Sequence, residues 1–227
     1  MSAVYQPFGL KPVYHPSGLD RAVPFVGTNV YNAGTTYTAP YTLSSGQSFY
    51  QFQPVALTTA GALTIAAQAA STGAANRIYG VFNGVEYTNS DGRRAVSKYA
   101  SKTTLDASTN IVFWIFSDPA LVYEAQVNGS VTTAGIGTQY NFDTTTGYTV
   151  TDGTSFTGGA GFSTTGLLAT AVTTAAQGQV RVVGLGREAA YPASSGTYPV
   201  TNAWGDAYTV VQVQIANNMF AAASVSI

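Results

Sequence analysis

The sequence predicts an all-β fold, and three observations lead to this prediction. Runs rich in β-branched and aromatic residues recur along the chain, as strands prefer. Asn-Gly and Asp-Gly dipeptides, which favour tight turns, follow or divide these runs at 83–84, 91–92, 128–129 and 152–153. Apolar residues make up 45% of the 227 residues, which is enough for a substantial core. We expect an antiparallel barrel or sandwich.

The chain begins with a segment that is predicted to be an extended arm, residues 1–25. Its prolines remove backbone donors and bias the residues before them away from helix. Apolar side chains along it would anchor it to whatever surface it lies against, and they are Tyr5, Phe8, Leu10, Val13 and Tyr14. The all-β domain then covers residues 26–227, either as one unit or as two packed subdomains, 26–130 and 131–227.

Strands and turns alternate from residue 35 onward. The first strands are expected in "TYTAPYTL", "QSFYQFQPVALT" and "GALTIAA", with a turn at 59–61, although "LTIAAQAA" also suits a short helix. In "YGVFNGVEY", residues 79–87, an aromatic and aliphatic pattern flanks Asn83-Gly84 on both sides, which predicts a tight hairpin. Asp91-Gly92 predicts the next turn, with "AVSKY" as the returning strand.

The second half of the chain follows the same pattern. Residues 111–116 are apolar throughout, as in a strand covered on both faces. A strand in "ALVYEAQV" should end at Asn128-Gly129, and a further turn is expected at Asp152-Gly153. Residues 153–178 suit an exposed loop, or a helix near Leu167–Ala176. Late strands are expected in "QVRVVGLG" and "AYTVVQVQIA".

Charge is unusually sparse. Charged residues supply 8% of the chain, against about 25% in typical soluble domains, and residues 22–76 contain none. Such a surface, rich in Tyr and Thr, suits a protein packed against others, while a secreted β protein with a neutral hydroxylated surface is the alternative. The net charge of −1 argues against broad adsorption to nucleic acid or anionic membranes. No signal peptide, apolar membrane span or cysteine is found in the sequence.

The sequence shows no catalytic, cofactor-binding or metal-binding motif. His15 is the only histidine, so a triad or a histidine metal site would depend on it alone, and a packing role is expected instead. Glu86 and Glu124 lie in predicted strands and would form a glycosidase pair only if they faced one cleft. The glycine-rich stretches carry no phosphate-binding pattern. We therefore predict that the protein is not an enzyme and needs no cofactor.

One cluster of charge stands out. Five of the nine basic residues fall within a short part of the chain, and they are Arg77, Arg93, Arg94, Lys98 and Lys102. These side chains suit the outward faces and turns of hairpins, where charge discourages edge-to-edge pairing. They also suit a basic rim that meets an acidic partner. Both interpretations stay open from the sequence.

Four segments resemble the head cement, or decoration, proteins of tailed bacteriophages, most closely those of short-tailed marine or freshwater phages. They are "FGLKPVYHPSG" (8–18), "IYGVFNGVEYT" (78–88), "SDPALVYEAQVNG" (117–129) and "VRVVGL" (180–185). The segment "FQPVALTTAGALTIAA" is also similar to the β-tulip units of such proteins. The resemblance implies a virion protein, made in the bacterial host cytoplasm, on the outer capsid surface.

The resemblance also implies partners. The protein would clamp neighbouring major capsid proteins, as a homotrimer, with no nucleic acid or membrane partner. Candidate contact residues, from the arm and the basic cluster, are Tyr5, Phe8, Leu10, Tyr14, Arg93 and Arg94. Deleting residues 1–24 is expected to leave a folded protein that no longer decorates shells. A tail-associated or receptor-binding β protein is the alternative, and a carbohydrate-active enzyme is a remote one.

Overall fold

The protein is built from antiparallel β-sheets. Its computed structural model describes residues 5, 7–18, 21–26, 39–66, 77–143, 163–173, 176–187 and 202–220. Within these residues the strands form two six-stranded sheets and one two-stranded sheet. The sheets remain open and the described strands close no barrel. The all-β prediction is confirmed, and of its two forms the open, sandwich-like one agrees with the structure.

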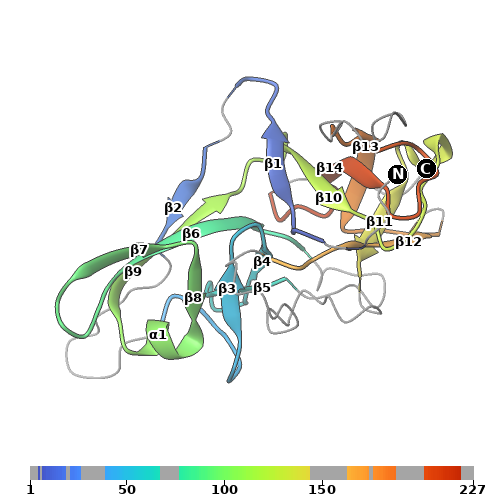
Figure 1. Cartoon of the computed structure of the whole chain (residues 1–227). Helices are drawn as coiled ribbons and strands as arrows, with labels where there is room; N and C mark the ends of the chain where they lie inside the picture. The colour runs from blue at the N-terminus through green and yellow to red at the C-terminus, as the bar shows by residue number, and fades with distance from the viewer. Residues whose placement is uncertain are drawn as a thin grey trace.

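The first large sheet, here called the β9 sheet, lies on the left in Figure 1. Its strand order is β2-β9-β6-β4-β5, with β7 paired to the far end of β6. The strands are β2 (Val23–Phe25), β4 (Pro54–Leu57), β5 (Leu63–Ile65), β6 (Gly80–Thr88), β7 (Arg94–Ser97) and β9 (Thr109–Phe116).

The second large sheet, here called the β10 sheet, lies on the right in Figure 1. Its order is β1-β10-β14-β13-β11-β12. The strands are β1 (Lys11–Tyr14), β10 (Val122–Gln126), β11 (Gln139–Phe142), β12 (Leu167–Ala171), β13 (Val180–Leu185) and β14 (Val210–Ile215). The chain passes from the β9 sheet to the β10 sheet between β9 and β10, and the division at residue 130 stays a prediction.

The remaining elements are short. A two-stranded sheet joins β3 (Ser48–Tyr50) to β8 (Tyr99–Ser101). It leads into α1 (Lys102–Asp106), where the Ser101 hydroxyl accepts a hydrogen bond from the Thr104 N–H and so caps the helix. A 3₁₀ turn, η2 (Thr133–Gly135), precedes β11. No helix among the described residues is long and apolar enough to cross a membrane.

One hydrophobic core extends through both large sheets. On the β9 side, the rings of Phe49, Phe82 and Phe113 pack together, with Phe49 and Phe113 centred 5.3 Å apart. On the β10 side, valines of β13 and β14 fill the same cluster. Tyr123 joins the two sides, because its buried hydroxyl donates to the Phe116 carbonyl at 3.3 Å. Burial raises the pKa of Tyr123, which therefore stays a neutral donor.

Most predicted strands and turns are confirmed. The turn at 59–61 joins β4 to β5, and Asn89–Arg93, with Gly92 at φ +80°, joins β6 to β7. The strand expected at 111–116 is β9, with one face fully buried and the other half-buried. "QVRVVGLG" contains β13 and "AYTVVQVQIA" contains β14. The expected turn at Asp152-Gly153 lies outside the described residues.

The hairpin predicted at Asn83-Gly84 is wrong. Residues 80–88 form one continuous strand, β6, and the dipeptide lies at a bulge in it. Its neighbours pair with β9 on one side and β7 on the other, while Asn83 Oδ1 accepts from Gln51 Nε2 at 3.0 Å. Pairing with two strands stabilises the extended form by more than the local preference for a turn.

The helix considered near Leu167–Ala176 is also not observed. Residues 167–171 form β12, which pairs with β11 at the edge of the β10 sheet. Leu167 is fully buried in the core, whereas the strand becomes exposed toward Ala171. Tertiary pairing has again overridden the helix propensity of an Ala-rich and Leu-rich stretch.

Candidate functional site

The N-terminal segment is extended, as predicted, but it belongs to the body of the protein. β1 forms the edge of the β10 sheet and β2 forms the edge of the β9 sheet. Gly9, at φ +80°, approaches the backbone so closely that a Cβ would lie 2.3 Å from the Phe52 carbonyl oxygen. The next residue, Leu10, donates its N–H to that oxygen at 2.8 Å. The start of the chain therefore ties the two sheets together.

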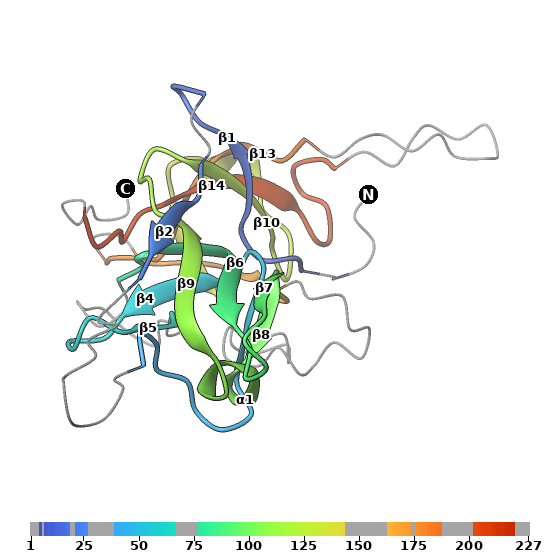
Figure 2. The same ribbon diagram turned by 90° about the vertical axis from the view of Figure 1, so that its left-hand side faces the viewer.

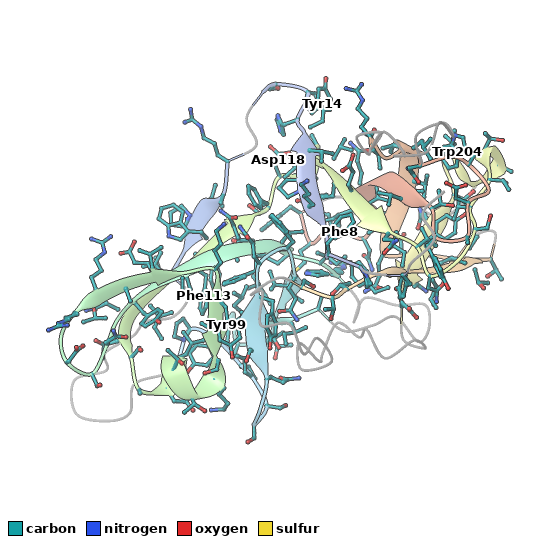
Figure 3. All side chains as sticks on the ribbon, in the orientation of Figure 1. Phe8, Tyr14, Tyr99, Phe113, Asp118 and Trp204 are labelled. Carbon is teal, nitrogen blue, oxygen red and sulfur yellow. The ribbon has the colours of Figure 1, made fainter. Side chains whose placement is uncertain are left out.

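The candidate contact residues at the start of this segment point inward or are partly covered. Leu10 is fully buried in the core, so its predicted role as a partner contact is wrong. The Tyr5 hydroxyl donates to Asp143 Oδ2 at 2.9 Å, and the Tyr5 ring lies 5.6 Å from that of Tyr208. Phe8 is half-buried in the middle of the molecule (Figure 3). Their apolar surface anchors the segment to its own domain.

This placement overturns the expectation for the deletion of residues 1–24. The deletion would remove Leu10 from the core and an edge strand from one sheet, and would leave β2 with a single residue. We therefore expect the truncated chain to be destabilised, so it cannot report on binding alone. Point substitutions at exposed positions are the informative variants.

β1, β2 and the described residues that connect them form a projecting arch, residues 11–18 and 21–26. The arch rises above both sheets in Figures 1 and 2. It presents four of the nine exposed large apolar side chains in the described part of the chain, which are Val13, Tyr14, Val23 and Val26. Tyr14, one of the predicted contacts, is 59% exposed. A projecting segment with several exposed apolar side chains is a candidate binding surface.

His15 stabilises the arch, as its predicted packing role requires. It is buried, its Nδ1 accepts from the Ser17 N–H at 3.1 Å, and its Nε2 lies 3.0 Å from Asp118 Oδ2. Because Nδ1 accepts, the ring proton is on Nε2, close to the Asp118 carboxylate. The Ala120 N–H and then His15 hold the pKa of Asp118 below its usual value, against the opposing effect of burial.

The other two predicted contacts, Arg93 and Arg94, lie at the tip of the β6–β7 hairpin. Both side chains are largely exposed. Arg93 lies 3.6 Å from Asp91, and Arg94 forms an ion pair with Glu86. Glu86 raises the pKa of Arg94 through a hydrogen bond and its charge. This hairpin tip lies at the outer end of the β9 sheet, away from the arch in Figure 1.

The two glutamates considered as a glycosidase pair do not face one cleft. Glu86 lies in the β9 sheet and pairs with Arg94. Glu124 lies in the β10 sheet and accepts a hydrogen bond from the Arg187 N–H at 2.8 Å. The pocket beside Glu124 is not lined by Glu86. Glu86 and Glu124 therefore do not form the pair that two-carboxylate hydrolysis requires.

A pocket of about 510 Å³ lies on the face of the β10 sheet that is turned away from the core. Its lining residues are Lys11, Val13, Tyr14, Glu124, Arg187 and Gln212. The sequence analysis identified Tyr14 and Glu124 but did not bring them together. Alternation along β1 places Lys11 and Val13 on one face, but only the strand register places Glu124 beside Lys11.

No cluster of three or more His, Asp or Glu side chains suited to a metal ion is found within the described residues. No protein-family model matches the chain, and searches of curated proteins and of solved structures returned no match.

Proposed function

We propose that this protein is a capsid cement, or decoration, protein that binds the outer surface of an icosahedral phage head. It would clamp neighbouring major capsid proteins and act as a homotrimer. The observation that carries the proposal is the arch, which presents four exposed apolar side chains. The protein as a whole is also poor in charged residues, which supply 8% of the chain. The sequence resemblance to decoration proteins supplies the partner.

The arch suits attachment to a protein surface for a physical reason. Its apolar side chains lose unfavourable contact with water when a partner covers them, and Tyr14 adds an aromatic anchor of the kind that dominates many interfaces. His15 and Asp118 hold the arch in place before binding, which reduces the entropy lost on association. An interface of ordinary size, about 1,200–2,000 Å², would also draw on surface around the arch.

The mechanism needs no chemical step. A protein that binds the assembled lattice better than isolated capsid subunits stabilises the assembled state by mass action. Attachment through three subunits adds avidity when all three reach their sites together. Arg93 and Arg94 offer a second, basic contact at the hairpin tip, suited to acidic groups on the shell.

A pair of matched substitutions tests the proposal. Val26 in the arch and Ile136 beside η2 are exposed to nearly the same extent, 47% and 48%. In a binding assay with purified heads lacking this protein, we expect Val26→Asp to reduce occupancy at least tenfold. Ile136→Asp should bind as the wild type does, and both variants should fold, because each site is exposed.

The number of copies per virion distinguishes a cement protein from a tail-associated protein. Cement proteins coat the whole shell, so a reconstruction of decorated heads should show trimeric density at many equivalent lattice sites. Density restricted to a vertex or tail would support the tail-associated alternative and overturn the proposal. Binding of Val26→Asp at wild-type occupancy would remove the arch from the interface.

A further inference from the structure

The pocket on the β10 sheet carries an inference that is independent of capsid attachment. Strand register places Lys11, Glu124 and Gln212 side by side across β1, β10 and β14. Arg187, Val13 and Tyr14 also line the pocket, the last two with apolar surface. The volume of about 510 Å³ is within the range typical of small-ligand sites.

Polar groups of the pocket have unused hydrogen-bonding capacity. Glu124 is only 8% exposed, and its one protein hydrogen bond among the described residues comes from the Arg187 N–H. A carboxylate so deeply buried normally has more donors around it. Within the described residues, the side chains of Lys11, Arg187 and Gln212 also make no hydrogen bond or ion pair. The pocket thus offers both acceptors and donors to a ligand.

The charges of the pocket indicate which class of ligand fits. A cationic ligand would satisfy Glu124 but would be repelled by Lys11 and Arg187. An anionic ligand would pair with these two cations but would lie against the Glu124 carboxylate. Neutral hydroxyl groups avoid both conflicts, because a hydroxyl donates to a carboxylate and accepts from an ammonium, guanidinium or amide group.

Tyr14 completes this chemistry. Tyr14 lines the pocket and is 59% exposed, and Figure 3 shows it in the arch at the top of the molecule. A flat aromatic face packs well against the C–H groups of a pyranose ring. We propose that this pocket binds a neutral saccharide unit. Because Glu124 is the only carboxylate among the described residues that line the pocket, these residues would hold a saccharide but supply no carboxylate pair for its hydrolysis.

The test is a titration of the full-length protein with galactose, glucose, mannose and N-acetylglucosamine, followed by NMR. At least one sugar should shift the Arg187 backbone amide and the Gln212 side-chain amide, with a Kd on the order of 1–10 mM. Glu124→Gln and Tyr14→Ala should each weaken binding about tenfold or more. Lys11→Met, at an exposed side chain, should weaken binding without affecting the fold, in case Glu124→Gln is unstable.

Glu86→Gln is the matched control, because it makes the same change in the other large sheet and should leave sugar binding unchanged. Acetate and methylguanidinium serve as anionic and cationic probes of the same pocket. A stronger response to either ion, or no response to any of the four sugars at about 100 mM, which is at least tenfold above the expected Kd, would overturn the proposal. Val26→Asp should bind sugar normally, so failure of capsid attachment and failure of sugar binding are distinguishable.

Discussion

The two large sheets each contain a glutamate on an interior strand, yet they use it differently. In the β9 sheet, Glu86 is paired with Arg94 at the exposed end of a hairpin. In the β10 sheet, Glu124 is buried against a backbone N–H, and the two nearest cations, Lys11 and Arg187, form no ion pair within the described residues. The Glu86 carboxylate is neutralised by Arg94, an arginine of the same sheet. The Glu124 carboxylate can accept further hydrogen bonds, which is what the proposed ligand would supply.

The two large sheets contribute different kinds of side chain to the common core. On the β9 side three phenylalanine rings from β3, β6 and β9 contact one another, whereas on the β10 side valines of β13 and β14 lie in the core with Tyr123 and Phe142. Large rings concentrate buried area in few residues, while valines distribute it over many. One continuous core is therefore assembled from two unequal sides, and four substitutions test how the two sheets differ.

The largest effect is expected from Phe113→Ala. Phe113 is fully buried and its ring contacts those of Phe49 and Phe82, so its loss should lower the free energy of unfolding by about 3–5 kcal/mol. Val213→Ala in the β10 sheet should cost about 1–3 kcal/mol. Urea denaturation measures both. Equal losses would contradict the larger contribution expected from the contacting rings of the β9 side.

An intermediate effect is expected at the connection between the sheets. The pKa of Asp118 is lowered in the folded protein, from about 3.9 in the unfolded chain. Its contribution to stability is therefore fully present above about pH 4 and is lost as the pH falls through the lower folded value. Asp118→Asn should flatten this part of the stability curve between about pH 2 and 5.

Urea unfolding of the wild type and of Asp118→Asn at several pH values measures the difference. The two curves should converge at low pH, where the wild-type carboxylate is protonated. Curves that stay parallel over the whole range would show that Asp118 does not contribute through its charge, and that the arch is held by packing instead.

The smallest effect is expected from Arg94→Gln at the outer end of the β9 sheet. Its side chain is largely exposed, and exposed ion pairs add little to stability because solvent and salt screen them. The midpoint of urea unfolding should remain at the wild-type value. A clear loss of stability would show that the Glu86 carboxylate destabilises the fold when Arg94 does not neutralise it. The two glutamates would then differ less than the comparison of their sheets implies.

Much of the fold could be predicted wherever local and tertiary preferences agree. β9, β10, β13 and β14 follow from their apolar, β-branched content, and the turn at Asp91-Gly92 follows from its dipeptide. The equivalent prediction at Asn83-Gly84 failed because β6 pairs on both sides there. Turn and strand preferences are worth about 1 kcal/mol per residue, which pairing with two neighbouring strands exceeds.

By itself, the sequence determined the all-β class, the sparse charge and the extended character of the first residues. It also showed that His15 is the only histidine, with no second one to share a metal or catalytic site. Only the tertiary structure decided that Leu10 is a core residue while Tyr14 is exposed, and that Glu124 lies beside Lys11, Gln212 and Arg187. The reason is that composition and periodicity act along the chain, whereas burial and register depend on which distant strands pair. In this protein those pairings place β1 at the edge of one large sheet and β2 at the edge of the other, so the arch that contains both strands spans the two sheets.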